Sequence, residues 1–176
     1  MPCTAFDGHR QIATGSLVEV ALSVKTAVDA GAAGPVLTFD DTTGDVVDFD
    51  LRGSAAEIAA RLEAPRGRGR PKLGVTAREV TLLPRHWDWL AGQPGGASVT
   101  LRRLIDEARR TDGGQGQIRA ARDAAYRFIS AMAGDLPGFE EAARALFAGD
   151  QDRFDRHSAL WPPDLRAYAL RLLRTA

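Results

Sequence analysis

The residues best suited to a chemical role are the cations that alternate with glycine and proline between positions 64 and 76. Arg66, Arg68, Arg70 and Lys72 lie there with no acidic residue among them. An extended Arg-Gly-Arg segment fits a narrow minor groove of DNA, because glycine lets the backbone approach closely and narrow A·T tracts attract inserted arginines. A guanine amino group would obstruct that path. The segment therefore predicts binding to A·T-rich double-stranded DNA.

The central run, Arg68-Gly69-Arg70-Pro71-Lys72, resembles the AT-hook, a minor-groove motif whose core is Arg-Gly-Arg-Pro. The resemblance covers five residues, and Arg66 and Lys72 would add contacts to phosphates. Prolines, glycines and repelling charges also predict that residues 64–76 form an irregular linker. A plain linker remains the alternative, because a short motif is only a hypothesis.

A second candidate region follows this arm. The pattern predicts a short strand over Glu79–Leu82, a helix that opens at Pro84, and a second helix over Ala97–Arg110. The block from Arg78 to Arg110 resembles a ribbon-helix-helix module, which implies that the strand pairs with the same strand of a second copy in the major groove. A lone strand is unstable, so we expect a homodimer.

The residues of this block differ in how well they suit contacts with DNA. If Val80 and Leu82 face a core, then Glu79 and Thr81 face outward, and Glu79 departs from the basic or amide residues usual in that family. Backbone anchoring is therefore favoured over base readout, with the amides from Gly96 to Ser98 holding a phosphate. The alternative is that the block packs against its own chain. The full set of expected DNA-binding residues is Arg66, Arg68, Gly69, Arg70, Pro71, Lys72, Arg78, Glu79, Thr81, Gly96, Ala97 and Ser98.

Further arginines recur along the second helix, at positions 102, 103, 109 and 110. We interpret them first as a solvated face paired with Asp106, Glu107 and Asp123, and only second as phosphate contacts.

The distribution of charge supports a polyanionic partner. The whole chain has a net charge of zero, but residues 1–64 carry a balance of −6, residues 65–130 one of +7 and residues 131–176 one of −1. A local field matters more to a polyanion than the total does. An acidic domain packed against its own basic segment is the alternative.

Other chemistry has little support. The three histidines are isolated and lack metal-ligand spacing, and Asp40, Asp41 and Asp45 fit solvated turns better than a cation site. We therefore expect no catalytic residue, no metal and no cofactor. Cys3 is the only cysteine, and no leader or apolar membrane segment is visible, which predicts a cytoplasmic, nucleoid-associated protein.

The elements that position these residues predict an α+β fold. Asp7-Gly8 and Thr43-Gly44 predict two hairpins, the second with strands Val36–Asp40 and Asp45–Leu51. Ser16 with Glu19, and Ser54 with Glu57, predict capping boxes, so residues 1–63 form an acidic ββα-ββα unit. Residues 77–112 form the central strand-helix-helix, and residues 117–176 a C-terminal helical cap with Phe154 and Trp161 in its core.

The whole chain also resembles an uncharacterised bacterial family, domain of unknown function 2239. The resemblance rests on residues 6–8, 48–53, 69–89, 94–98 and 161–164, among them Asp48-Phe49-Asp50-Leu51-Arg52-Gly53 and Trp161-Pro162-Pro163-Asp164. It implies no activity.

The sequence thus favours a dimeric bacterial DNA-binding protein, either a transcriptional regulator or a nucleoid-associated protein. A protein-interaction module, antitoxin-like or an adaptor, is the alternative, and a small-molecule enzyme is a distant third.

Overall fold

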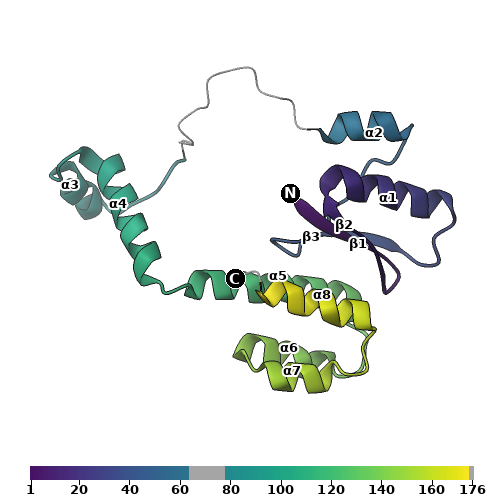
Figure 1. Cartoon of the computed structure of the whole chain (residues 1–176). Helices are drawn as coiled ribbons and strands as arrows, with labels where there is room; N and C mark the ends of the chain where they lie inside the picture. Colours follow the sequence, from purple (N-terminus) through teal and green to yellow (C-terminus); the bar gives the residue numbers. More distant parts are fainter. Residues whose placement is uncertain (64–77, 175–176) are drawn as a thin grey trace. The chain divides into compact units, whose positions relative to one another are not determined.

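The computed structural model describes residues 1–63 and 78–174 of the chain. The chain divides into two compact units, and the first of these joins residues 1–64 to residues 116–176. The second unit, residues 65–115, is inserted between those two segments of sequence (Figure 1). Each unit is described by itself below.

The first unit is α+β and contains a three-stranded antiparallel sheet of order β2-β1-β3. Its strands are β1 (Pro2–Asp7), β2 (Arg10–Ser16) and β3 (Val36–Asp40). The expected first hairpin is confirmed, and Gly8 adopts a φ of 56° between the two strands. This left-handed conformation is one that glycine adopts without the steric cost of a side chain.

Both expected capping boxes are confirmed. In α1 (Leu17–Asp29) the carboxylate of Glu19 accepts from the amide of Ser16 over 2.9 Å. In α2 (Ala55–Leu62) Glu57 accepts from the amide of Ser54 over 2.7 Å in the same way. Each box satisfies amides that the helix itself leaves unpaired, so these two helices begin where their local sequence indicates.

The second strand of the second hairpin, expected over Asp45–Leu51, was a wrong prediction. The turn forms, because the amide of Asp40 donates to the carbonyl of Asp45 over 2.9 Å. After it, only an isolated bridge joins Phe39 to Val46. The chain then leaves β3 with no further ladder among the described residues.

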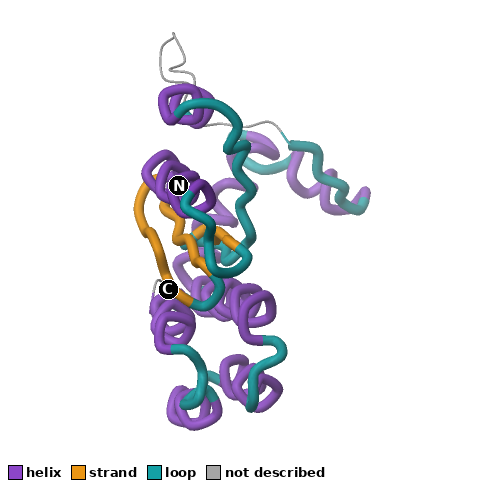
Figure 2. Tube along the Cα trace, turned by 90° about the vertical axis from the view of Figure 1, so that its right-hand side faces the viewer, coloured by secondary structure: helices purple, strands orange, loops and turns teal. Residues whose placement is uncertain are grey.

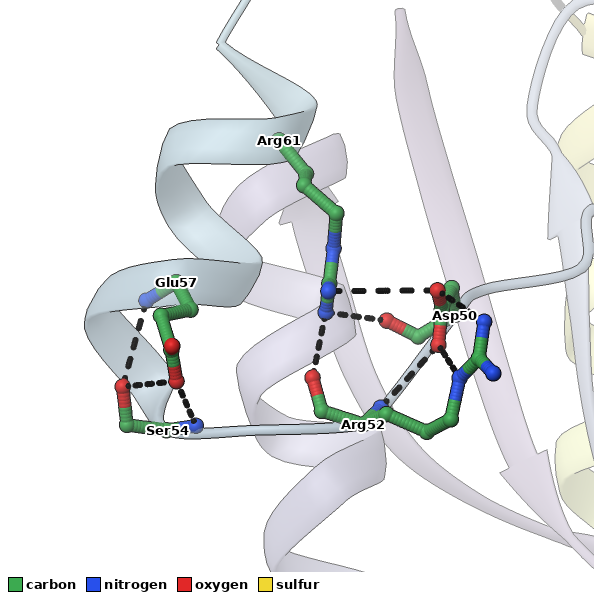
Figure 3. A network of polar contacts seen from close by, with 5 residues as sticks. All are labelled: Asp50, Arg52, Ser54, Glu57 and Arg61. Atoms are coloured by element: carbon green, nitrogen blue, oxygen red, sulfur yellow. Dashed lines mark hydrogen bonds and ion pairs between the residues drawn. The ribbon is translucent and has the colours of Figure 1, made fainter.

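Arg61 of α2 binds the backbone of the irregular segment that follows this bridge. Its guanidinium donates to the backbone carbonyls of Asp50 and Arg52, with 2.9 Å to the first (Figure 3). Arg52 in turn binds the carboxylate of Asp50 through two nitrogens, each at 2.9 Å. A side chain therefore satisfies two backbone carbonyls of a segment that no described strand pairs with.

The remaining helices of the described chain follow the expected pattern closely. Gly116 lies inside the first turn of α5, where the sequence predicted a break. The helices of the second unit are α3 (Pro84–Ala91) and α4 (Gly96–Thr111), and those that follow are α5 (Gln115–Ala133), α6 (Phe139–Ala148), α7 (Gln151–His157) and α8 (Pro163–Arg174).

The sheet is the middle layer of the first unit, and helices cover both of its faces (Figures 1 and 2). Cys3 and Ala5 of β1 pack with Val20 and Val24 of α1 on one face. Phe6, which points the other way, joins the cluster formed by the C-terminal helices. The central strand is thus buried on both faces, as a strand between two layers must be.

Four aromatic rings hold the sheet to the C-terminal helices. Phe6 and Phe39 of the sheet contact Phe128 of α5 and Tyr168 of α8. Ring centroids lie 4.9 Å apart for Phe39 and Phe128, and 4.5 Å apart for Phe128 and Tyr168, in edge-to-face arrangements that suit the ring quadrupoles. The N-terminal and C-terminal segments therefore share one core.

The turn after β3 also contacts α5 closely. Gly44 has a φ of 70°, and a Cβ at this position would overlap the carbonyl oxygen of Ala124. Arg127 of α5 donates to the carbonyl of Thr43 over 2.7 Å and pairs with Asp45 at 3.4 Å. Only glycine fits at position 44, for reasons of both conformation and space.

Candidate nucleic-acid interface

The expected DNA-binding residues divide between two parts of the chain. Arg66, Arg68, Gly69, Arg70, Pro71 and Lys72 all lie outside the described residues. The described part of the candidate interface begins at Arg78 and runs through α4.

Residues 78–83 have no regular secondary structure in the isolated chain. The expected outward positions Glu79 and Thr81 are exposed, and so are Arg78 and Val80, the latter at 53%. A strand forms only against another strand, and the described chain supplies none to this segment. Pairing through Glu79–Leu82 with a second copy remains a prediction.

The helix α3 starts where proline can serve as its first residue. Pro84 has no amide hydrogen to satisfy, and Leu83 before it is extended, with φ −66° and ψ 149°. Leu90 is buried at the other end of α3 and packs the helix toward α4. The two helices therefore form a hairpin that presents the start of α4 at its turn.

Two successive glycines build that turn. Gly95 and Gly96 have φ values of 86° and 74°, and Val99 fills the space beside Gly95. The first turn of α4 has no capping side chain and no acidic residue. The amide of Gly96 donates to the carbonyl of Gln93 over 3.0 Å. Of the three amides expected to hold a phosphate, that of Gly96 is already used, which leaves those of Ala97 and Ser98.

The arginines of α4 bind their own helix. Arg102 donates through Nε to the carbonyl of Ser98 over 3.0 Å, and Arg110 donates to the carbonyl of Asp106 over 3.4 Å. Across the described residues, no ion pair joins an arginine to Asp106, Glu107 or Asp123. The expected pairing of this face is thus not formed among residues 1–63 and 78–174.

The described residues of the second unit form almost no core of their own. Within residues 78–115, only Leu90 and Thr100 are buried. Helical hairpins of this length are rarely stable without a partner, since domains below about 40 residues usually need a metal, a disulfide or oligomerisation. Its large exposed apolar side chains are Val80, Leu83, Trp87, Trp89, Val99, Leu104 and Ile105.

The sequence of the chain matches a known protein family. Residues 2–173 match a bacterial family described as uncharacterised proteins conserved in bacteria, domain of unknown function 2239 (DUF2239). The chain belongs to this family. No curated protein and no solved structure matches it. The DUF2239 match spans both units but assigns neither of them an activity.

Two general properties of this DUF2239 chain bear on its chemistry. No helix in residues 1–63 or 78–174 is both long and apolar enough to cross a membrane. Over the same residues, His, Cys, Asp and Glu form no group of three that could hold a metal ion.

A polar cluster in the first unit was not anticipated from the sequence. The hydroxyl of Thr4 donates to Oδ1 of Asp41 over 2.7 Å, and the hydroxyl of Tyr168 donates to the same oxygen over 2.9 Å. Thr4 has a single hydroxyl proton, and the bond to Asp41 uses it. In the contact of 2.9 Å between Thr4 and Thr14, the hydroxyl of Thr14 is therefore the donor. Arg171 also donates to Thr4 and lies over the ring of Tyr168.

This cluster fastens β1 and the end of β3 to α8. Burial, together with the neighbouring Asp41, raises the pKa of Tyr168 far above its ordinary value. Burial and the charges of Asp41 and Asp40 raise the pKa of Cys3 to about 11, so its thiol stays protonated at neutral pH. No local signal could have found these partners, because 37 positions separate Thr4 from Asp41 and 127 separate Asp41 from Tyr168.

A small cleft of about 160 Å³ opens between the C-terminal helices. Its cation, Arg122, donates to the carbonyl of Phe147 over 3.0 Å and so satisfies the end of α6. Gly149 leaves the space in which this guanidinium lies. Arg122 thus binds a carbonyl at the C-terminal end of α6, and Gly149 leaves room for the Arg122 side chain.

Proposed function

We propose that this chain is a bacterial DNA-binding protein that acts as a dimer, either as a transcriptional regulator or as a nucleoid-associated protein. In this proposal the Arg-rich arm, residues 64–76, enters the minor groove of A·T-rich DNA. The region around α3 and α4 docks nearby and contacts phosphates. The N-terminal and C-terminal segments supply the folded body that carries this region.

The observation that carries the proposal is the division of charge between the two units. Residues 65–115 hold 10 of the 23 Arg and Lys residues but only 5 of the 23 Asp and Glu residues, a balance of +5. The first unit holds the remaining 13 and 18, a balance of −5. A small basic unit inserted in an acidic one is suited to a polyanion, because charge clustered in one region attracts phosphates from a distance.

The start of α4 adds a second, local argument. Its first turn carries the positive end of the helix dipole, and no acidic side chain offsets it. Ser98 is exposed there, and its hydroxyl could donate to the same phosphate oxygen. Phosphate contacts hold a protein in register on DNA but carry no sequence information. Together with Glu79 on the expected ribbon, this favours backbone anchoring over base readout.

A gel-shift series in increasing salt tests the proposal. A·T-rich and G·C-rich duplexes of equal length are compared from about 50 to 200 mM salt. Each neutralised phosphate adds roughly 0.9 to the slope of log affinity against log salt, so the four arm cations account for a slope of up to about three or four per arm. Equal binding to both duplexes would remove the minor-groove arm from the proposal. No binding at the lowest salt would overturn DNA binding altogether.

A protein-interaction module is the second candidate, and one observation favours it. Seven large apolar side chains are exposed in the second unit, which suits a protein partner better than a phosphate backbone. A protein that dimerises but ignores both duplexes at low salt would support this alternative.

A further inference from the structure

The cleft between the C-terminal helices combines apolar walls with one cation. Helices α5, α6, α7 and α8 all contribute to it, and every lining residue belongs to the first unit (Figure 1). Its apolar side chains are those of Ile118, Leu146, Phe154 and Leu173. Leu146 and Phe154 are buried, whereas Ile118 is 36% exposed. Apolar surface therefore extends from the interior of the helical layer to its outside.

The size of the cleft suits a small molecule. Its volume is about 160 Å³. An apolar cavity of about 150 Å³ in another protein holds one benzene molecule, so this cleft has room for a single ring or a branched chain of similar size. Drug-sized ligands occupy sites of roughly 300–1,000 Å³, and they would not fit here.

Arg122 brings a positive charge that has no counterion among the described residues. Its guanidinium is half-buried, and it donates one hydrogen bond, from Nη1 to the carbonyl of Phe147 over 3.0 Å. No carboxylate of the described chain forms an ion pair with it. Arginine has five N–H donors, so most of them are open to a ligand. A bound anion would offset the cost of holding this charge partly out of water.

Asp150 also lines the cleft, but its charge is stabilised by its own helix. Its Oδ1 accepts from the amide of Arg153 over 2.9 Å, as the N-cap of α7. The other polar lining side chain, Gln151, is uncharged. Arg122 is therefore the lining residue that best suits a charged ligand.

We propose that this cleft binds a small apolar monocarboxylate, an aromatic or branched aliphatic acid about one ring in size. The carboxylate binds the guanidinium of Arg122, whose planar fork of donors suits two parallel hydrogen bonds. The apolar part lies against Ile118, Leu146 and Phe154 and is removed from water. A phosphate is a poorer match, because most of its oxygens would face apolar side chains. This binding is separate from the proposed DNA contacts, which involve the other unit.

Benzoate is the probe that tests the site, with benzyl alcohol and benzylamine as neutral and cationic molecules of the same ring. Each is titrated into the full chain and followed through the backbone amide signals in NMR spectra. Benzoate should shift the amides of Gly149 and Gln151 in a saturable way, with a Kd of about 1 mM or less. Benzyl alcohol should bind about tenfold more weakly, because it lacks the charge-assisted bond. Benzylamine should cause no saturable shift.

Variants separate the charge from the apolar walls. Arg122→Gln removes the charge and keeps the walls, so it should weaken benzoate at least tenfold and leave benzyl alcohol unchanged. Ile118→Ala removes apolar contact and should weaken both ligands. Gln151→Glu adds a negative charge at an exposed lining position and should weaken benzoate severalfold. Arg156→Gln, exposed on α7 and outside the lining, is the matched control for the loss of one positive charge.

Four results would each overturn the proposed site: no saturable shift with benzoate, equal binding of benzoate and benzylamine, shifts confined to residues outside the cleft, or an Arg122→Gln variant that binds benzoate as the parent does. Circular dichroism shows whether each variant keeps its helices. If Arg122→Gln does not fold, Gln151→Glu decides the question, because it leaves the bond from Arg122 to Phe147 in place. Unchanged benzoate affinity in a folded Gln151→Glu variant would then overturn the site.

Discussion

The hydroxyl of Tyr168 in α8 donates a hydrogen bond of 2.9 Å to Oδ1 of Asp41, the residue that follows β3. Tyr168 is only 1% exposed, and its ring lies in the aromatic cluster of the core. The contact joins residues 127 positions apart. It thus ties the last helix of the chain to the end of its sheet.

Replacing Tyr168 with Phe should lower the free energy of unfolding by about 1–3 kcal/mol, because Asp41 loses a donor in a largely buried place. Urea denaturation measures this change. Tyr126→Phe is the matched control: its ring contacts Phe147 and is 37% exposed, and its hydroxyl makes no hydrogen bond in the described chain. Equal stability of the two variants would refute the role of the Tyr168 hydroxyl.

Gly44→Ala should destabilise the protein more than Gly31→Ala does. Both glycines have similar positive φ values, 70° and 79°, so both variants carry the same backbone strain. A Cβ at position 44 overlaps the carbonyl of Ala124, whereas one at position 31 meets nothing within 4 Å. Overpacking of this kind costs roughly 1–3 kcal/mol in addition to the strain. Equal midpoints in thermal melts of the two variants would show that the turn does not contact α5.

Stability should fall in alkaline solution partly through Cys3. Its pKa is raised from 9.0 to about 11 in the folded protein, so the fold keeps a proton that the unfolded chain releases. The contribution of Cys3 is therefore fully present below about pH 9 and is lost as the pH rises to about 11. Urea midpoints of the parent and Cys3→Ala, compared between pH 8 and 11, measure the effect. Parallel pH profiles would mean that the thiol is not buried.

Replacing Arg68 and Arg70 with Ala should weaken DNA binding, flatten its salt dependence by up to about two units of slope and erase the A·T preference. Gel shifts with both duplexes measure all three effects. The melting temperature, recorded in parallel, separates loss of DNA contact from loss of fold. If the double variant unfolds, the two arginines pair with the acidic segment instead of with DNA.

Val80→Pro should abolish dimers that form through residues 79–82, because proline removes an amide that a ribbon needs. Light scattering should report about twice the chain mass of 18.9 kDa for the parent and a lower mass for the variant. Val80→Thr keeps both the amide and the β-branch, and it should still dimerise. A dimer that survives proline at position 80 would show that the two copies meet elsewhere.

The helices could largely be predicted because their signals are local. Ser16 and Glu19 lie three residues apart and form the capping box that their types indicate. Pro84 likewise lies at the start of a helix, as expected. Such signals depend on neighbours along the chain and so do not require knowledge of the tertiary fold.

The failures involve partners distant in the sequence. Phe49 and Leu51 alternate with polar residues as a strand would, and they do pack against the cluster around Cys3. The alternation therefore identified partly buried side chains correctly, but it did not show that the carbonyls of Asp50 and Arg52 bind the side chain of Arg61 and not a strand. The periodicity of apolar residues predicts which side chains are buried. It does not predict which groups form hydrogen bonds with the backbone amides and carbonyls.

The residue types of the candidate interface could be predicted from the sequence, but its geometry could be predicted only in part. The exposed start of α4 follows from Gly95 and Gly96, which any sequence reading places in a turn. The amide of Gly96 donates a hydrogen bond to the carbonyl of Gln93. This bond depends on the conformation of the turn and could not be predicted.

The shared core of the first unit has a consequence for synthesis of the protein on the ribosome. Phe39 leaves the ribosome early, but its partner Tyr168 belongs to the last helix. At roughly 5–20 residues per second, the chain between them takes on the order of 10 s to make. During that interval the N-terminal strands present unpaired edges and bare aromatic side chains. The nascent chain should therefore need protection by a ribosome-associated chaperone until Tyr168 has left the ribosome.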